Sequence, residues 1–87
     1  MSAKRSEKAI RTATEEIRDR IWYDRSLSGP DPTDPAILEG RNKSRLRVEM
    51  EHEGNLGPYT DFEWGMLNGK LSALRWVLGE RWDDLGT

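Results

Sequence analysis

Apolar residues recur at helical spacing near the start of the chain. They follow one another every three or four positions: Ile10, Ala13, Ile17 and Ile21. Good helix formers lie between them, and Glu16 precedes Arg20 by four residues, a spacing at which opposite charges attract on a helix surface. The pattern predicts an amphipathic helix over residues 4–27 that has one narrow apolar face to bury.

Prolines end this pattern. Pro30, Pro32 and Pro35 fall within six residues, and each ring removes a backbone donor and disfavours the helical region for the preceding residue. The segment is therefore predicted to be a turn or linker. Asp34 followed by Pro35 is also a start signal, with an N-cap residue before the first helical position. A second helix is expected over residues 35–53.

Residues 45–52 carry a competing signal. Leu46, Val48 and Met50 alternate with charged residues, which is the period of a β-strand. A single strand leaves its edges unpaired, and the pattern of the chain offers no second strand to pair with it. The sequence therefore favours a helix that continues to about Glu53.

A break containing glycine and proline precedes the last predicted helix. Thr60 and Glu63 have the spacing of a capping box, in which each side chain accepts from the backbone N–H of the other residue. Gly79 can take the left-handed conformation that ends a helix. A third helix is expected over residues 60–79, followed by a short docked tail at 80–87.

The third predicted helix is apolar on nearly every side. Ten of its residues are apolar: Phe62, Trp64, Met66, Leu67, Leu71, Ala73, Leu74, Trp76, Val77 and Leu78. Such a helix needs cover on more than one face, and in a chain this short the cover comes from both other helices or from a second subunit. The sequence predicts an all-α, three-helix, single-domain protein.

Gly65 and Gly69 have a spacing that lets another helix backbone approach closely, although in a chain without a membrane span it is also compatible with ordinary composition. We expect a homodimer through the third helix, with Trp64, Gly65, Gly69, Ala73 and Trp76 at the contact. This expectation agrees with the composition. Only 34% of the 87 residues are hydrophobic and 34% are charged, so one copy has little apolar surface to offset chain entropy.

Several classes of protein are disfavoured. No run approaches the roughly 18 apolar residues that span a bilayer, and the first residues lack an apolar signal core, so we expect a cytoplasmic protein. The chain has no cysteine, which excludes disulfides, a thiol nucleophile and thiolate zinc sites. No serine or threonine has a base at recognisable spacing, and no phosphate-binding glycine loop is present. We expect neither an enzyme nor a cofactor.

Four tryptophans are a large apolar content for so polar a chain: Trp22, Trp64, Trp76 and Trp82. They either form the interior of the monomer or anchor a partner, because tryptophan is enriched at binding hot spots. Trp22 with its neighbour Tyr23, and Trp82, lie near segment ends and are the predicted anchors. Arg25 and Arg75 are predicted to contact the same partner at the rim of the interface.

Two further clusters of polar residues suggest chemistry. Glu49 and His52 would share a helix face, as in the metal-binding pairs of di-metal bundles, but such sites need two pairs and further glutamates, so a solvated acidic face is the simpler interpretation. The second cluster is basic: Arg41, Lys43, Arg45 and Arg47. It permits an alternative function, a small nucleic-acid-binding regulator, against which stands the acidic sequence pI of 5.4.

The stretch from Asp61 to Gly79, continued by Trp82, Asp83, Asp84 and Leu85, resembles the C-terminal segment of a family of small proteins of unknown function from actinobacterial phages and bacteria. The resemblance covers about the last third of the chain, and more loosely residues 23–35. It implies no enzymatic activity. It implies a phage or prophage setting, in which small gene products bind and redirect a host protein, so we expect a host protein as a partner.

Overall fold

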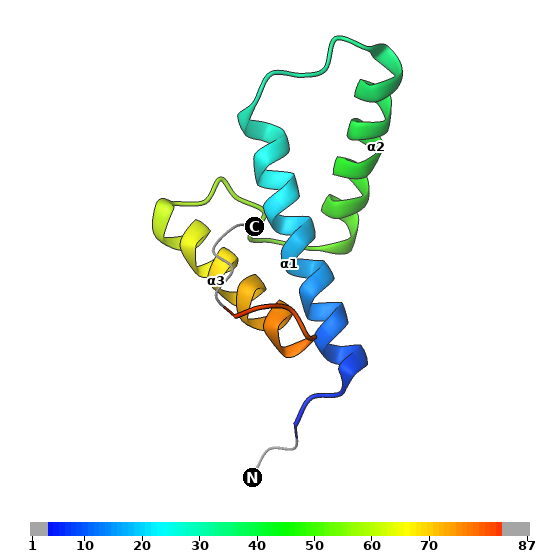
Figure 1. The fold of residues 1–87 in the computed structure, drawn as a ribbon. Coiled ribbons are helices and arrows are strands. Elements are labelled where there is room, and N and C mark those ends of the chain that lie inside the picture. Colours follow the sequence, from blue (N-terminus) through cyan, green and yellow to red (C-terminus); the bar gives the residue numbers. More distant parts are fainter. Residues whose placement is uncertain (1–3, 83–87) are drawn as a thin grey trace.

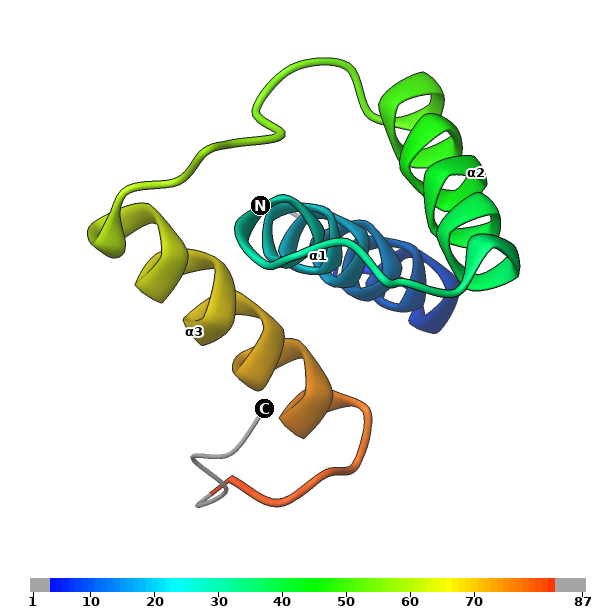
Figure 2. The same ribbon diagram turned by 90° about the horizontal axis from the view of Figure 1, so that it is seen from above.

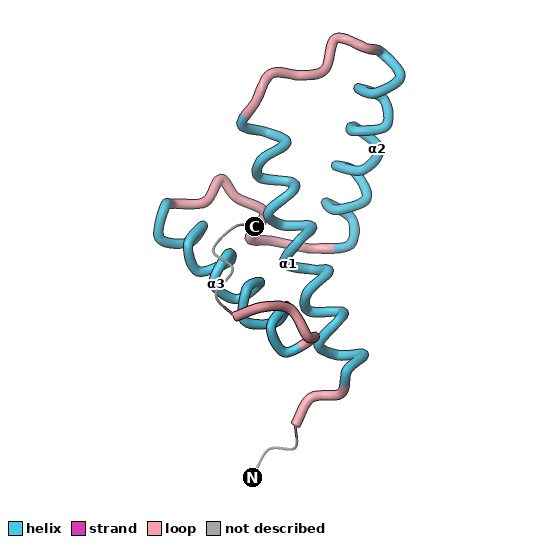
Figure 3. Tube along the Cα trace, in the orientation of Figure 1, coloured by secondary structure: helices cyan, strands magenta, loops and turns pink. Residues whose placement is uncertain are grey.

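The computed structural model describes residues 4–82, which form three helices joined by loops (Figure 1). Helix α1 spans Glu7–Ser28, α2 spans Pro35–Glu51 and α3 spans Asp61–Val77. Figure 3 shows that the described part contains helices and loops and no strand. The predicted all-α, three-helix fold is confirmed, including the helical interpretation of residues 45–51.

Helix α1 lies between the other two (Figure 2). Both α2 and α3 contact α1, whereas no residue of α2 is in contact with α3. The chain is correspondingly open and elongated, with extents of 49 × 26 × 23 Å. The sequence predicts cover for α3 from both other helices or from a second subunit, and of the two other helices described only α1 packs against it.

Each helix begins where its local sequence signals a start. The Ser6 side chain accepts a hydrogen bond from the Ala9 backbone N–H at 3.1 Å, and that of Asp34 accepts one at 2.9 Å in front of Pro35. At α3 both bonds of the predicted capping box are present, between Thr60 and Glu63. These bonds satisfy backbone N–H groups that have no acceptor within the helix.

The buried apolar core of the described residues is small. Ile21 and Tyr23 on α1, Val48 on α2 and Leu71 on α3 are its members. Val48 is fully enclosed, with 0% exposure, and is the one buried residue that α2 contributes. Apolar burial therefore fixes α2 on α1 largely through a single side chain.

Polar contacts supply much of the remaining attachment of α2 to α1. The Tyr23 hydroxyl donates to Glu49, and the Arg47 guanidinium donates to both carboxylate oxygens of Asp19 at 3.2 and 3.3 Å. Two residues before Arg47, Arg45 donates to the backbone oxygen of Ser26, near the end of α1. Because these contacts join different helices, they fix the position of α2 along α1.

Candidate functional site

The side of α3 that faces away from α1 is apolar and exposed. We call it the outer face of α3, and it consists of Phe62, Gly65, Met66, Gly69, Ala73, Trp76 and Val77, all of them exposed. Among the large side chains Phe62 is 76% exposed, Met66 48%, Trp76 51% and Val77 54%. These residues follow one another at intervals of one, three or four, so they form one continuous stripe along the helix.

The middle of the outer face is hollow. A shallow groove of about 500 Å³ is lined by Phe62, Gly65, Met66, Gly69 and Ala73, with charged Asp61 and Lys70 at its edge. Apart from its chain neighbours and the backbone of its own helix, a Cβ atom added to Gly65 or to Gly69 would meet no atom within 4 Å. The two glycines therefore leave their backbone open to a partner, as their spacing predicts.

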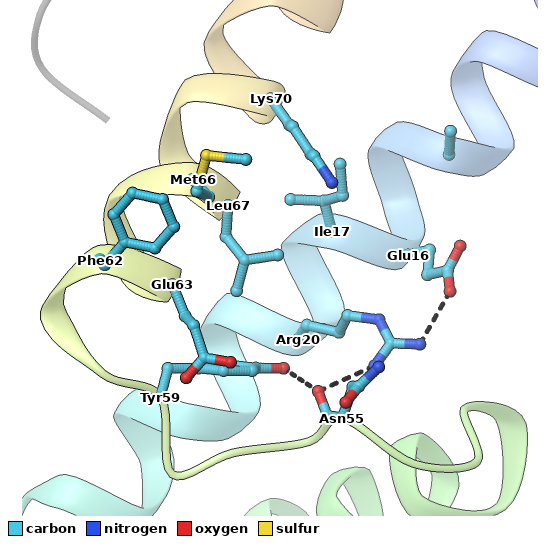
Figure 4. A pocket seen from close by; sticks show the side chains of 11 residues that line it. Glu16, Ile17, Arg20, Asn55, Tyr59, Phe62, Glu63, Met66, Leu67 and Lys70 are labelled. Carbon is cyan, nitrogen blue, oxygen red and sulfur yellow. Dashed lines mark hydrogen bonds and ion pairs between the residues drawn. The ribbon is translucent and has the colours of Figure 1, made fainter.

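A second pocket adjoins this groove and lies between α1 and α3 (Figure 4). Its volume is about 540 Å³, and Ile17 of α1 and Leu67 of α3 contribute apolar walls. Phe62, Met66 and Lys70 line both hollows, and in Figure 4 the Lys70 side chain extends toward Ile17. The exposed apolar surface thus continues from α3 onto α1.

The polar groups of this pocket hold the loop before α3. Arg20 of α1 donates to the backbone oxygens of Gly54 and Asn55, at 2.9 Å each, and to Glu16 at 2.9 Å. The Tyr59 hydroxyl donates to the Asn55 oxygen. Because Arg20 already donates to these acceptors, its role here is to position the loop before α3.

Three of the predicted partner-binding residues make contacts within the chain. Tyr23 is only 9% exposed, because its ring packs in the contact between α1 and α2. Its hydrogen bond to the Glu49 carboxylate, together with burial, raises the pKa of Tyr23 above its ordinary value. Arg25 lies over the ring of Trp64, 5.5 Å from the centroid, and Arg75 forms an ion pair with Glu80.

The two tryptophans of α3 lie on opposite sides of that helix. Trp64, predicted at the dimer contact, lies half-buried under Arg25 on the side toward α1. Trp76 is on the outer face, and Trp82 packs edge-on against it, with ring centroids 5.1 Å apart and an interplanar angle of 69°. Trp82 is 66% exposed and Trp22, on α1, is 37% exposed. Of the predicted docked tail, residues 83–87 lie outside the described residues.

The basic cluster of α2 has partners within the chain. Arg41 donates to the Ser26 oxygen at 2.8 Å, and Arg45 donates to the hydroxyl of the same serine at 3.1 Å. Lys43 lies 3.4 Å from Glu39, and Arg47 is bound to Asp19 and Glu51. These cations therefore already have acceptors within the chain, although Lys43 and Arg47 stay exposed.

His52 caps the C-terminal end of α2, where that helix lies beside α1. Its Nε2 atom is 3.1 Å from Asp19, while Glu49, the predicted partner on the same helix face, binds Tyr23. Asp19, Glu51 and His52 bring ligand-type atoms within 4.8 Å of one another. Arg47 donates to both carboxylates, so a guanidinium already supplies positive charge to this cluster, which we interpret as an ion-pair network.

The ionisation of Asp19 reflects this environment. Partial burial opposes the charged form, but the hydrogen bonds and charges of Arg47 and His52 outweigh burial and hold the pKa of Asp19 below its ordinary value. No signal in the sequence singles out Asp19. Its partners come from a helix 28 or more positions further along the chain, and no local spacing indicates them.

The predicted contact surface omits Phe62, Met66 and Val77, although the spacing needed to find them is present. They lie at helical intervals from Gly69 and Ala73, which the prediction includes. Because α3 is apolar all round, its sequence alone does not indicate which side turns toward α1.

Comparisons with known proteins add no identification. No family model, curated protein or solved structure matches this chain. Among the helices of residues 4–82, none combines the length and the apolar character required to cross a bilayer.

Proposed function

We propose that the protein is a non-enzymatic interaction module of the cytoplasm that pairs with a second copy and binds a host protein. Both contacts use the outer face of α3, so the second copy and the host protein exclude each other there. The observation that carries the proposal is that this face is continuous, apolar and exposed, on a helix whose opposite side is already packed against α1. Exposed apolar patches of this kind mark interaction sites in soluble proteins.

The amount of exposed surface supports the same proposal. A compact monomer of this mass exposes roughly 5,200 Å² by the scaling of surface with size. The whole chain exposes 6901 Å². The difference agrees with the open, elongated arrangement of the helices, in which α3 is covered by a helix on one side only. The chain therefore has surface available for a partner without unfolding.

The chemistry of the outer face also favours binding. Trp76 and its edge-on neighbour Trp82 present indole rings, and aromatic rings are enriched at binding hot spots. The flanking charges of Asp61 and Lys70 give the apolar stripe a polar border. An apolar centre with a polar rim is the common anatomy of a protein interface.

The proposed biological setting follows from the resemblance of residues 61–79 and 82–85 to small phage and bacterial proteins. We place the protein in a phage or prophage, where it binds and modulates a host protein in the host cytoplasm. Trp22, Trp76 and Trp82 are the aromatic contacts that the exposed surface offers to such a partner.

The test is the mass of the protein in solution with and without a charge on the outer face. Ala73→Glu keeps a good helix former at the centre of the stripe but adds a carboxylate there. Light scattering at micromolar concentration is expected to give about 20 kDa, twice the 10.0 kDa chain, for the natural protein and about 10 kDa for the variant. The matched control is Ala9→Glu, the same change at an exposed position of α1.

Each outcome has a definite meaning. A natural protein that stays at the mass of a single chain contradicts the pairing. A host protein that is retained equally by the natural chain and by Ala73→Glu contradicts the assignment of the outer face as its binding surface. Circular dichroism of each variant establishes that the helices are intact.

A further inference from the structure

Five of the seven residues of the outer face of α3 are arranged symmetrically about Gly69, the exceptions being Met66 and Val77. Phe62 lies seven positions before Gly69 and Trp76 lies seven positions after it. Gly65 and Ala73 lie four positions before and after the same glycine. Since seven residues are close to two turns, aromatic residues stand at both ends of the stripe, and three small residues lie between them beside Met66.

This arrangement fits a second copy of the same face when that copy runs in the opposite direction. We infer that two copies pair through their outer faces as an antiparallel pair of α3 helices, with the two-fold axis at Gly69. This inference rests on the proposed function, and it specifies the partner and the register. Phe62 then lies opposite the partner's Trp76, and Gly65 lies opposite the partner's Ala73, so the ends are filled by aromatic rings while the two backbones approach at the centre.

Space for the second backbone is present. Outside the backbone of α3 and the neighbouring residues in the chain, no atom lies within 4 Å of the place that a Cβ would take on Gly65 or Gly69, so the groove over these glycines is free. Helix α1 packs on the other side of α3, and α2 lies beyond α1 (Figure 2). A copy that approaches the outer face therefore meets α3 before either of the other helices.

Charge favours the antiparallel direction over the parallel one. The first turn of α3 carries Asp61 and Glu63. A parallel pair would bring the two acidic turns together, and like charges across an interface weaken it. In the antiparallel pair the two Asp61 residues are separated by about 24 Å along the helix axis, from a rise of 1.5 Å per residue. That distance exceeds the screening length in physiological salt, roughly 8 Å.

Disulfide trapping tests the register without interference from natural thiols, because the natural chain contains no cysteine. The variants are Gly65→Cys, Ala73→Cys and the double variant that carries both. In the antiparallel pair of the double variant, the thiol introduced at position 65 faces the thiol introduced at position 73 of the partner. Mild oxidation is therefore expected to convert most of the double variant to a covalent dimer on a non-reducing gel. A bond within one helix is excluded, because positions 65 and 73 are about 12 Å apart along it.

The single variants provide the decisive comparison. In the antiparallel pair the two thiols of either single variant are about 12 Å apart, so each single variant is expected to give at least ten times less covalent dimer. A parallel pair reverses this result, since each single variant then forms the disulfide with itself. Lys43→Cys, exposed on α2, is the control for random collision.

Light scattering on the same samples separates the inference from the proposed function. A species of twice the chain mass with efficient trapping in the single variants overturns the antiparallel register and leaves the interaction module intact. A species of that mass with no trapping in any variant overturns the assignment of the contact to this part of α3. A species with the mass of one chain overturns the pairing itself, and the binding of a host protein is then decided by the comparison of the natural chain with Ala73→Glu.

Discussion

Replacing Val48 by alanine tests how α2 is held. Val48 is fully enclosed, and it is the one buried residue of α2 in the described chain. The change removes two methyl-sized groups, at about 0.8 kcal/mol each, and leaves a small cavity, so we expect a loss of about 2 kcal/mol of unfolding free energy. Such a loss is about thirty-fold in the unfolding equilibrium and a large fraction of the stability of a small domain.

The assay is urea unfolding followed by circular dichroism, with Val77→Ala as the matched variant. Val77 is also helical but 54% exposed, so the helix propensity that alanine gains is common to both variants and cancels in the comparison. Both are made in the Ala73→Glu background to keep the protein monomeric. We expect Val48→Ala to be less stable than Val77→Ala by at least about 1 kcal/mol. Equal stabilities, within about 0.5 kcal/mol, would show that burial of Val48 does not hold α2.

Three further substitutions test the polar contacts and the loop. Because the pKa of Asp19 is lowered in the folded protein, its ion pair with α2 contributes stability above the ordinary carboxyl pKa of 3.8, and this contribution is lost as the pH falls through the lower folded value. Thermal unfolding between about pH 2 and pH 6 is therefore expected to depend less steeply on pH in Asp19→Asn, and an unchanged profile would contradict the assignment. Gly57 has a φ of +97°, and a Cβ there would lie 2.7 Å from Asp24 Oδ1, so Gly57→Ala is expected to cost about 1 kcal/mol or more. Gly40→Ala, in α2 with open space around it, is expected to gain a similar amount, and urea unfolding that gives the two changes the same sign would refute this interpretation of the loop.

The starts of α2 and α3 could be predicted because their signals are local, whereas α1 begins at Glu7, three residues after the predicted start. Thr60 and Glu63 reach each other across three residues, and Asp34 with Pro35 starts α2 by chemistry that depends on neighbours alone. Gly79 likewise has the positive φ, +107°, predicted for the end of α3. The alternation in residues 45–52 is misleading as a strand signal, because only Val48 of that series is buried and Leu46 and Met50 face solvent.

The candidate site was predictable only in part, since partners distant in the chain decide which residues are available. Trp22 and Tyr23 are neighbours with similar sequence signals, but neighbouring helical residues point about 100° apart, and α2 covers the tyrosine and leaves the tryptophan partly exposed. Arg41 and Arg45 form a basic cluster in the sequence, yet the end of α1 supplies acceptors at Ser26. The contact role of Gly65, Gly69, Ala73 and Trp76 stays a prediction.

The middle position of α1 limits how the two ends of the molecule can influence each other. Since α2 and α3 do not touch within the described chain, an allosteric effect of a ligand at one of these helices on the other has only two routes. One runs through α1, and the other runs along the loop that Arg20 fixes at Gly54 and Asn55. Loss of the hydrogen bonds from Arg20 to this loop should therefore reduce the energetic coupling between α2 and α3, even though Arg20 belongs to neither helix.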